Sequence, residues 1–278
     1  MVQPYTMKTD TYYQFPISAL SYGIQHGDRW EHILFYACLH YGRKAIQKTP
    51  DFILGPDVRT YQHKHNIPSR PSETPDQTAI LFGMTRFGLN VPSKEPQHFV
   101  DLASQVEKHC ASRPYPMVRI RAHFWWKTFG VSKDRAPISF REFCVLCAVY
   151  ALVGDKPYAK ASLDRIRRFA AGIPDRAEFD LALSHPEGVP NSLLLSTRQT
   201  RTTLDDLELN CFFAKFTYNR GECFYSNRLD RAELGAAVAK RKLSKKETIA
   251  ANRELDRAAS REIKERIENS AVIWMNAA

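Results

Sequence analysis

The chain has 278 residues, of which 44% are hydrophobic and 12% aromatic, and its formal net charge is +10 with a pI near 9.3. This composition is typical of a globular protein with a substantial core, and it excludes a disordered or low-complexity chain. The basic excess, which both halves share, suggests an anionic partner but does not identify one. There is no apolar run typical of a signal peptide or a membrane span, and the six cysteines are too sparse for a disulfide-stapled domain. We therefore expect a protein of the reducing cytoplasm that does not enter a membrane.

The first part of the chain predicts a helical domain. Residues 1–22 are rich in tyrosine and irregular in pattern, and apolar residues then recur at helical spacing. Thr74, followed by Pro75 and Gln77, is a typical helix start. Everything from residue 23 to residue 130 is expected to be helix or loop. The spacing predicts four helices, over residues 30–46, 75–88, 93–111 and 118–129.

A proline-rich polar stretch over residues 49–75 carries Arg59, His63 and His65. Two histidines one residue apart resemble the metal-binding pair of rolling-circle replication nucleases, in which the imidazoles hold a divalent ion that activates a phosphodiester. Arg59 and His65 also match the Arg-x5-His spacing of certain helical ribonucleases, where both side chains stabilise a cyclising phosphate. Lys64, however, stands where the rolling-circle enzymes carry an apolar residue on a strand. We interpret the stretch as a surface loop, with a metal-dependent or metal-independent nuclease as the alternative.

The most strongly apolar helix of the sequence follows. Ser139 and Glu142 form a capping box, and the residues after them are apolar nearly all round, which is typical of a central core helix. Cys144 and Cys147 lie on this helix without a second pair of ligands nearby. We interpret the two cysteines as buried small hydrophobes.

The next helix is predicted over residues 158–171, with an apolar side and an opposite side that carries Arg165 and Arg168. A gap of some 24 residues then precedes the following helix start, which is longer than a simple turn. We expect this gap to hold a short helix and a small strand, over residues 178–183 and 193–195.

The stretch from Ser192 to Arg228 predicts a helix followed by a hairpin. Ser196 is a good N-cap, and the helix after it ends at Asn210, which tolerates the left-handed conformation. Residues 212–218 then alternate with the two-residue period of a strand, and turn residues separate them from a returning strand. The apolar stripe of the helix consists of Thr200, Leu204, Leu207 and Cys211.

This order of elements over residues 139–228 resembles the winged helix-turn-helix superfamily of DNA-binding domains. The resemblance implies that the helix after Ser196 enters the major groove by its N-terminal half. Arginine and glutamine read guanine and adenine edges there, so base contacts are expected from Arg198, Gln199, Arg201 and Thr202. Phosphate contacts are expected from basic residues of the neighbouring elements, namely Arg165, Arg168, Lys215, Arg220 and Arg228.

Two other arrangements are consistent with the same patterns. Residues 139–172 and 192–228 could belong to two related units, as in plasmid replication initiators with paired winged helices. Alternatively, the winged fold could dock a protein, in which case the chain would be a protein-interaction module with little salt-dependent affinity for DNA.

The last part of the chain is helical in character and short of apolar residues. Ser244 and Glu247 form a capping box, which predicts a charged helix from there to about residue 273. A thin apolar thread makes this helix a possible homodimer contact, through Leu255, Ala259, Ile263, Ile267 and Trp274. Cations before and at the capping box add expected phosphate contacts, namely Lys240, Arg241, Lys242, Lys245 and Lys246.

These patterns predict a mainly α fold in three parts: a helical N-terminal domain (residues 1–133), a winged-helix domain (residues 134–230) and a charged C-terminal helical segment (residues 231–278). The expected function is binding of double-stranded DNA by a nucleoid-associated cytoplasmic protein, a regulator or a replication or maintenance factor of a mobile element or plasmid. No phosphate-cradling glycine loop and no catalytic constellation is recognisable. We therefore predict no catalytic residue, no cofactor and no metal.

Overall fold

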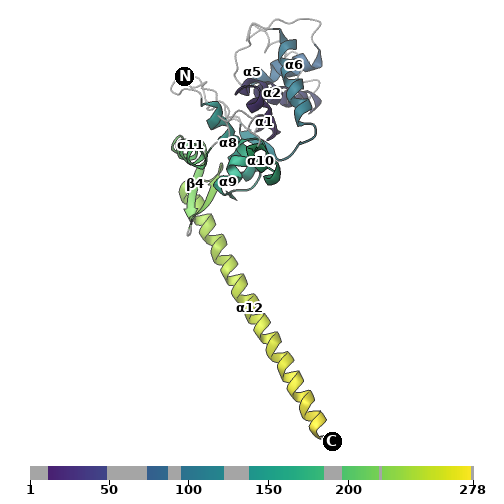
Figure 1. The fold of residues 1–278 in the computed structure, drawn as a ribbon, viewed down its shortest axis with the longest axis vertical. Helices are drawn as coiled ribbons and strands as arrows, with labels where there is room; N and C mark the ends of the chain where they lie inside the picture. The colour runs from purple at the N-terminus through teal and green to yellow at the C-terminus, as the bar shows by residue number, and fades with distance from the viewer. Residues whose placement is uncertain are drawn as a thin grey trace. The chain divides into compact units, whose positions relative to one another are not determined.

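The computed structural model of the protein describes residues 12–48, 74–86, 95–121, 138–184, 196–218 and 221–276, with residues 262–276 described by their backbone alone. Contacts group the chain into two units, Met1–Arg228 and Leu229–Ala278, and each is considered by itself. Helices make up most of the described residues and the strands are short (Figure 1), which confirms a mainly α protein. The boundary expected at residues 133 and 134 stays a prediction.

The first part of the first unit contains strands and helices that pack together, although residues that the structure does not describe separate some of them in sequence. Their bounds are β1 (Tyr12–Pro16), α1 (Ala19–Gln25), α2 (Trp30–Lys48), α5 (Pro75–Arg86), α6 (Pro96–Cys110) and β2 (Met117–Arg121). Helix α2 packs against both α5 and α6, so three of the four predicted helices form one group. Thr74 caps α5 as expected, because its hydroxyl accepts the backbone N–H of Gln77 and its own N–H donates to the Gln77 side chain.

Close approach and a shared ion pair hold α2, α5 and α6 together. A Cβ added to Gly42 on α2 would lie 2.0 Å from the carbonyl oxygen of Ala79 on α5, so only glycine permits this packing. Arg43 donates to both carboxylate oxygens of Asp76 at 2.7 Å and to Glu107 on α6 at 2.9 Å. The hydrogen bonds from Arg43 hold the pKa of Asp76 below its usual value.

Two strands were not predicted, because residues 1–22 were expected to be irregular and residues 23–130 to be helix or loop. Strands β1 and β2 pair antiparallel, with Phe15 opposite Val118. The helix predicted over residues 118–129 is therefore wrong in its first residues. Val118 and Ile120 are fully buried and alternate with arginines, which is the two-residue period of a strand. Residues 122–130 lie outside the described part.

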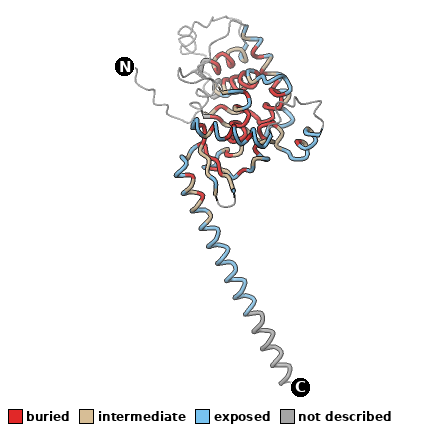
Figure 2. The backbone as a smooth tube through the Cα atoms, turned by 60° about the vertical axis from the view of Figure 1, so that its left-hand side comes forward, coloured by how far each residue is buried: buried red, intermediate tan, exposed pale blue. Residues whose placement is uncertain are grey.

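The remainder of the first unit is arranged around a central helix. Its elements are α8 (Phe140–Val153), β3 (Ala159–Lys160), α9 (Leu163–Ala170), α10 (Arg176–Ser184), α11 (Thr197–Leu209), β4 (Ala214–Tyr218) and β5 (Glu222–Ser226). Helix α8 contacts α9, α11, β2 and β5. The predicted capping box of Ser139 and Glu142 is formed, and the helix after it is buried on almost every side, which confirms a core helix. In Figure 2 the buried stretches concentrate in this first unit.

Three strands form an antiparallel sheet in the order β3-β5-β4. Strand β4 pairs with β5 in a hairpin that places Phe216 opposite Phe224, and β3 adds to the other side of β5 with Ala159 opposite Tyr225. The predicted hairpin is confirmed. The phenol of Tyr150 on α8 donates to the carbonyl oxygen just before β4 at 2.7 Å, which ties the sheet to the central helix.

Helix α9 is shorter than predicted. Residues 159–160, expected at the start of the helix, form β3 instead, and the helix begins after Ser162, whose hydroxyl accepts the N–H of Arg165. Helix α10 confirms the short helix expected over residues 178–183. The small strand expected at residues 193–195 lies outside the described residues.

The end of α11 also differs in one residue from the prediction. The left-handed residue is Cys211, with φ of 57°, whereas Asn210 has φ of −80°. Cys211 is exposed, so the buried stripe of this helix ends at Leu207. The side chain of Asn210 donates to the carbonyl of Asp206 at 2.9 Å, which satisfies one of the open acceptors at the helix end.

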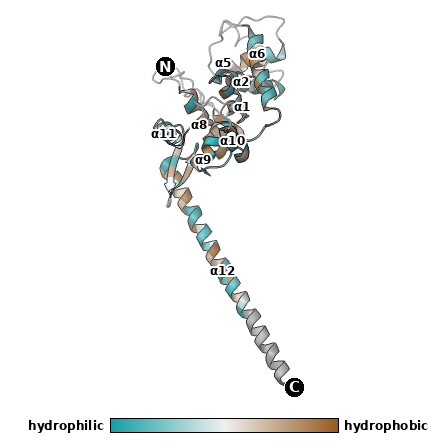
Figure 3. Cartoon of the chain, viewed as in Figure 1, coloured by the Kyte–Doolittle hydropathy of each residue, from teal (hydrophilic) through white to brown (hydrophobic). Residues whose placement is uncertain are grey.

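The second unit consists of α12 (Arg231–Asn276), a single helix of 46 residues. It starts well before the predicted capping box, because the side chains of Asp230 and Glu233 accept each other's backbone N–H. Ser244 lies within the helix, where its carbonyl accepts from the hydroxyl of Thr248. Hydrophilic and hydrophobic residues alternate along the described part of α12 (Figure 3). No helix among the described residues is both long and apolar enough to cross a membrane.

Candidate nucleic-acid interface

Helix α11 is set in place by its cap and its buried face. The hydroxyl of Ser196 accepts the N–H of Gln199 at 3.1 Å, and the Gln199 side chain accepts the N–H of Ser196 at 2.9 Å. Thr200, Leu204 and Leu207 are all fully buried, and helix α11 packs on both α8 and α9. The stripe predicted from Thr200 to Leu207 therefore fixes which side of the helix faces outward.

The outward side carries the residues that were expected to read bases. Arg198, Arg201 and Thr202 are exposed, and neither guanidinium forms an ion pair or side-chain hydrogen bond with any residue that the structure describes. The hydroxyl of Thr202 donates to the carbonyl of Arg198 at 3.2 Å, which leaves its lone pairs available as acceptors. These three side chains stand on the first two turns of the helix, where a recognition helix meets base edges.

Gln199 also has a structural role, because it completes the capping box of α11. Its side-chain oxygen is used by the capping box with Ser196, although the side chain is exposed. A bidentate contact with adenine needs that oxygen as acceptor together with the amide as donor. The sequence contained the signal for this role, because a serine followed three residues later by glutamine is a capping-box pattern.

Lys215 and Asp205 form an ion pair between β4 and α11. The Lys215 side chain is only 19% exposed, so this predicted phosphate contact is largely engaged within the protein. The same pair neutralises one of the carboxylates at the C-terminal half of α11. Asp206 and Glu208 lie on the same half, away from the exposed arginines at the start of the helix.

The two arginines of α9 differ in their surroundings. Arg165 is exposed, and its guanidinium lies 5.6 Å from the ring centre of Phe169. The Arg168 side chain is only 16% exposed; it donates to the carbonyl of Pro174 at 2.6 Å and pairs with Asp164 at 3.3 Å. Of the two predicted phosphate contacts, only Arg165 is presented to solvent.

Of the two arginines predicted to contact phosphates near the hairpin, the structure describes only Arg228. Arg228 lies 3.9 Å from Asp155, which also pairs with Arg119 on β2, so its guanidinium is partly engaged. Arg220 lies outside the described residues. In the second unit, Lys240, Arg241, Lys245 and Lys246 are exposed, whereas Lys242 is half-buried.

The alternative nuclease chemistry stays a prediction, because Arg59, His63 and His65 lie outside the described residues. Cys144 and Cys147 are buried as predicted, and burial raises the pKa of both thiols. Within the described ranges, no group of histidine, cysteine, aspartate and glutamate side chains is arranged to hold a metal ion.

The acidic partners that decide which cations are available were not predicted from the sequence. Asp164 could have been found, since it precedes Arg168 by four residues on a helix. Asp155 and Asp205 are distant in sequence from the cations they meet, so no local pattern indicates them.

Comparison with known proteins found no similarity: no family model, no curated protein and no solved structure matches this chain.

Proposed function

We propose that residues 139–228 form a winged helix-turn-helix domain that binds double-stranded DNA through α11. The order β3-β5-β4 supports this proposal, because a winged helix pairs the strand before its second helix with the last strand of the wing. Helices α8, α9 and α11 pack on one another, which favours one such domain over two related units. The long gap between α9 and α11 accommodates the additional helix α10.

The observation that carries the proposal is the exposed N-terminal half of α11. Arg198 and Arg201 point away from the core on a helix whose opposite side is fully buried. Arginine donates two parallel hydrogen bonds to guanine, and a good bidentate pair contributes about 1–3 kcal/mol of discrimination. Arg165 on α9 is the best-placed phosphate contact, since the helix before a recognition helix crosses the backbone.

Duplex binding is tested by the affinity for random-sequence DNA at two salt concentrations. Contact with several phosphates should make the logarithm of the affinity fall with a slope of about −0.9 per neutralised phosphate. The double variant Arg198→Ala, Arg201→Ala should bind at least about tenfold more weakly than the wild type, because it loses two cations at the contact.

A matched control removes the same charge elsewhere. Arg141 on α8 and Arg176 on α10 are exposed, and neither lies on α11, so the double variant Arg141→Ala, Arg176→Ala should bind within about threefold of the wild type. Equal losses in the two double variants would mean that net charge alone drives binding. No binding by the wild type at low salt would rule out the DNA proposal and favour the protein-interaction module.

We also propose that α12 mediates a homodimer through the thread that starts at Leu255. The Leu255 side chain is 68% exposed, and Ala259 beside it is exposed as well. Leu243 is similarly exposed but lies 12 residues earlier, which turns it about 120° away from Leu255 around the helix. Leu255→Lys should therefore lower the dimer fraction in sedimentation equilibrium, whereas Leu243→Lys should not. A wild-type protein that remains monomeric at all concentrations would refute the dimer.

A further inference from the structure

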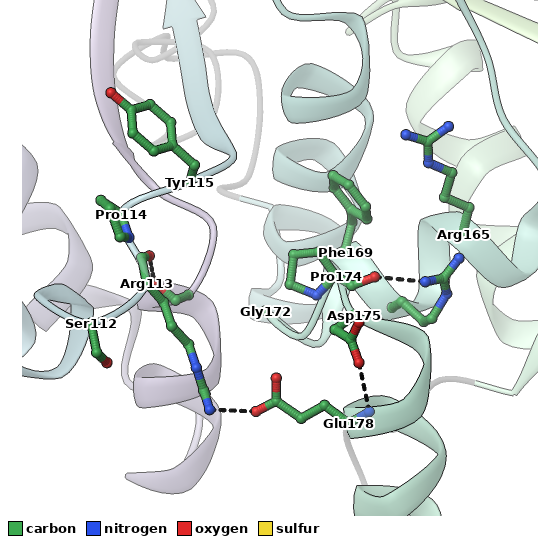
Figure 4. A pocket seen from close by; sticks show the side chains of 12 residues that line it. Ser112, Arg113, Pro114, Tyr115, Arg165, Phe169, Gly172, Pro174, Asp175 and Glu178 are labelled. Carbon is green, nitrogen blue, oxygen red and sulfur yellow. Dashed lines mark hydrogen bonds and ion pairs between the residues drawn. The ribbon is translucent and has the colours of Figure 1, made fainter.

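A hollow of about 790 Å³ opens on the first unit, where the segment between α6 and β2 faces α9 and the turn before α10. Its lining includes Tyr115 from that segment and Arg165 and Phe169 from α9. Figure 4 shows Tyr115 and Arg165 on opposite sides of the hollow, with Phe169 and Pro174 between them. The volume falls in the range of small-molecule sites, and neither the base-reading residues of α11 nor the rest of that helix takes part in the lining.

The charges in the hollow leave one cation available for an anion. The Asp175 carboxylate accepts the N–H of Glu178 at 2.9 Å, and the Glu178 carboxylate pairs with Arg113 at 2.6 Å. Arg168 is engaged by Pro174 and Asp164. Glu178 is therefore paired and Asp175 caps α10, whereas Arg165 forms no ion pair with any described residue and its exposed guanidinium is open to a ligand.

The apolar lining adds a surface for a planar group. Tyr115 is 77% exposed at the rim, so its side chain is accessible to a ligand. A loop contact holds the segment in place, because the Ser18 hydroxyl donates to the carbonyl of Arg113 at 2.8 Å. Nucleotides bind where a base stacks on an aromatic ring and a basic side chain neutralises the phosphate, and Tyr115 and Arg165 offer one group of each kind on facing sides of the hollow.

From the exposed Tyr115, the apolar ring of Phe169 and the guanidinium of Arg165, which forms no ion pair with a described residue, we infer that this hollow is a nucleotide site, with the base stacked on Tyr115 and the phosphate on Arg165. The ligand is a single nucleotide unit, supplied either free or as part of a single strand. Arg165 is shared with the proposed duplex contact, whereas Tyr115 and Phe169 are not, and no residue of α11 lines the hollow.

The test is calorimetric titration of the full chain at low salt, in the Arg198→Ala, Arg201→Ala background so that α11 contributes nothing. The probes are deoxyadenosine 5′-monophosphate and the single strand (dA)6, with deoxyadenosine and deoxyribose 5-phosphate as base-only and phosphate-only controls. Binding of either nucleotide probe is expected, and the tighter of the two identifies the source. Tyr115→Ala should weaken it about tenfold by removing the stack, and Tyr115→Phe should preserve it.

A second variant tests the phosphate contact separately from the contact with the base. Arg165→Gln should weaken the monophosphate about tenfold and leave deoxyadenosine unchanged, because only the phosphate contact is lost. The control Arg141→Gln removes an exposed cation outside the hollow and should change neither titration. No binding of either nucleotide probe, or binding that Tyr115→Ala leaves intact, would overturn the nucleotide site while leaving the duplex-binding proposal standing.

Discussion

Helices α9 and α11 begin alike but present their arginines differently. Each starts after a serine whose hydroxyl accepts the N–H three residues on, and each buries an apolar side in the same core. On α9, Arg168 is held by Asp164 and by the turn before α10, whereas Arg198 and Arg201 on α11 are exposed and form no ion pair with any described residue. The contacts that each arginine makes within the protein therefore decide which arginines can bind a ligand.

The buried sides of the two helices should be equally important for stability. Leu204 on α11 and Ile166 on α9 are fully buried in the same core. Replacing either by alanine should lower the free energy of unfolding by about 2–5 kcal/mol, because each change removes buried apolar volume. Urea denaturation of the two variants measures this. A clearly smaller loss for Leu204→Ala would show that α11 is held less firmly than α9, and the comparison of their outer sides would then need revision.

Truncating an engaged arginine should cost stability, and truncating an exposed one should not. Arg168→Ala leaves the Pro174 carbonyl and Asp164 without their partner, so we expect a loss of about 1–3 kcal/mol in the free energy of unfolding. Arg198→Ala should change it by less than about 0.5 kcal/mol. Urea denaturation of the two variants measures both effects. Equal losses in the free energy of unfolding would mean that Arg168 on α9 and Arg198 on α11 do not differ in their contribution to stability.

Gln199 allows the capping role and the DNA role to be separated. Gln199→Glu keeps an acceptor for the N–H of Ser196, so the capping box and the thermal midpoint should be preserved. The new negative charge beside the phosphates should nevertheless weaken duplex binding about tenfold. Gln199→Ala loses the reciprocal cap and should lower stability by about 1 kcal/mol. Unchanged DNA affinity of the glutamate variant would place the α11 contact elsewhere.

The smallest effect is expected for the ion pair between Asp205 and Lys215. Both side chains are partly exposed, and water screens such a pair, so a double-mutant cycle with alanine should give a coupling of about 0.2–1 kcal/mol. Lys215→Ala should also weaken DNA binding less than Arg165→Ala, since Lys215 is already paired. A larger loss of duplex affinity for Lys215→Ala than for Arg165→Ala would mean that Lys215 on the hairpin is a main phosphate contact.

Local patterns were sufficient where the controlling interaction is close in sequence. The capping box at Ser139, the apolar stripe through Leu204 and the hairpin after Cys211 were all predictable, because each depends on residues within one turn or one strand pair. The strand at Val118 was mistaken for a helix. Its partner β1 lies about a hundred positions away, and only that pairing makes the two-residue period meaningful.

The sequence by itself determined the mainly α character, the core helix α8 and the outward direction of Arg198 and Arg201, since capping and hydrophobic periodicity act over a few residues. Only the tertiary structure decided the order β3-β5-β4, the hydrogen bond from Arg168 to the Pro174 carbonyl, the pairing of Lys215 with Asp205, and the hollow beside Tyr115. These features depend on which segments meet after folding. Most of them join segments far apart along the chain, and whether a side chain remains exposed depends on how those segments pack.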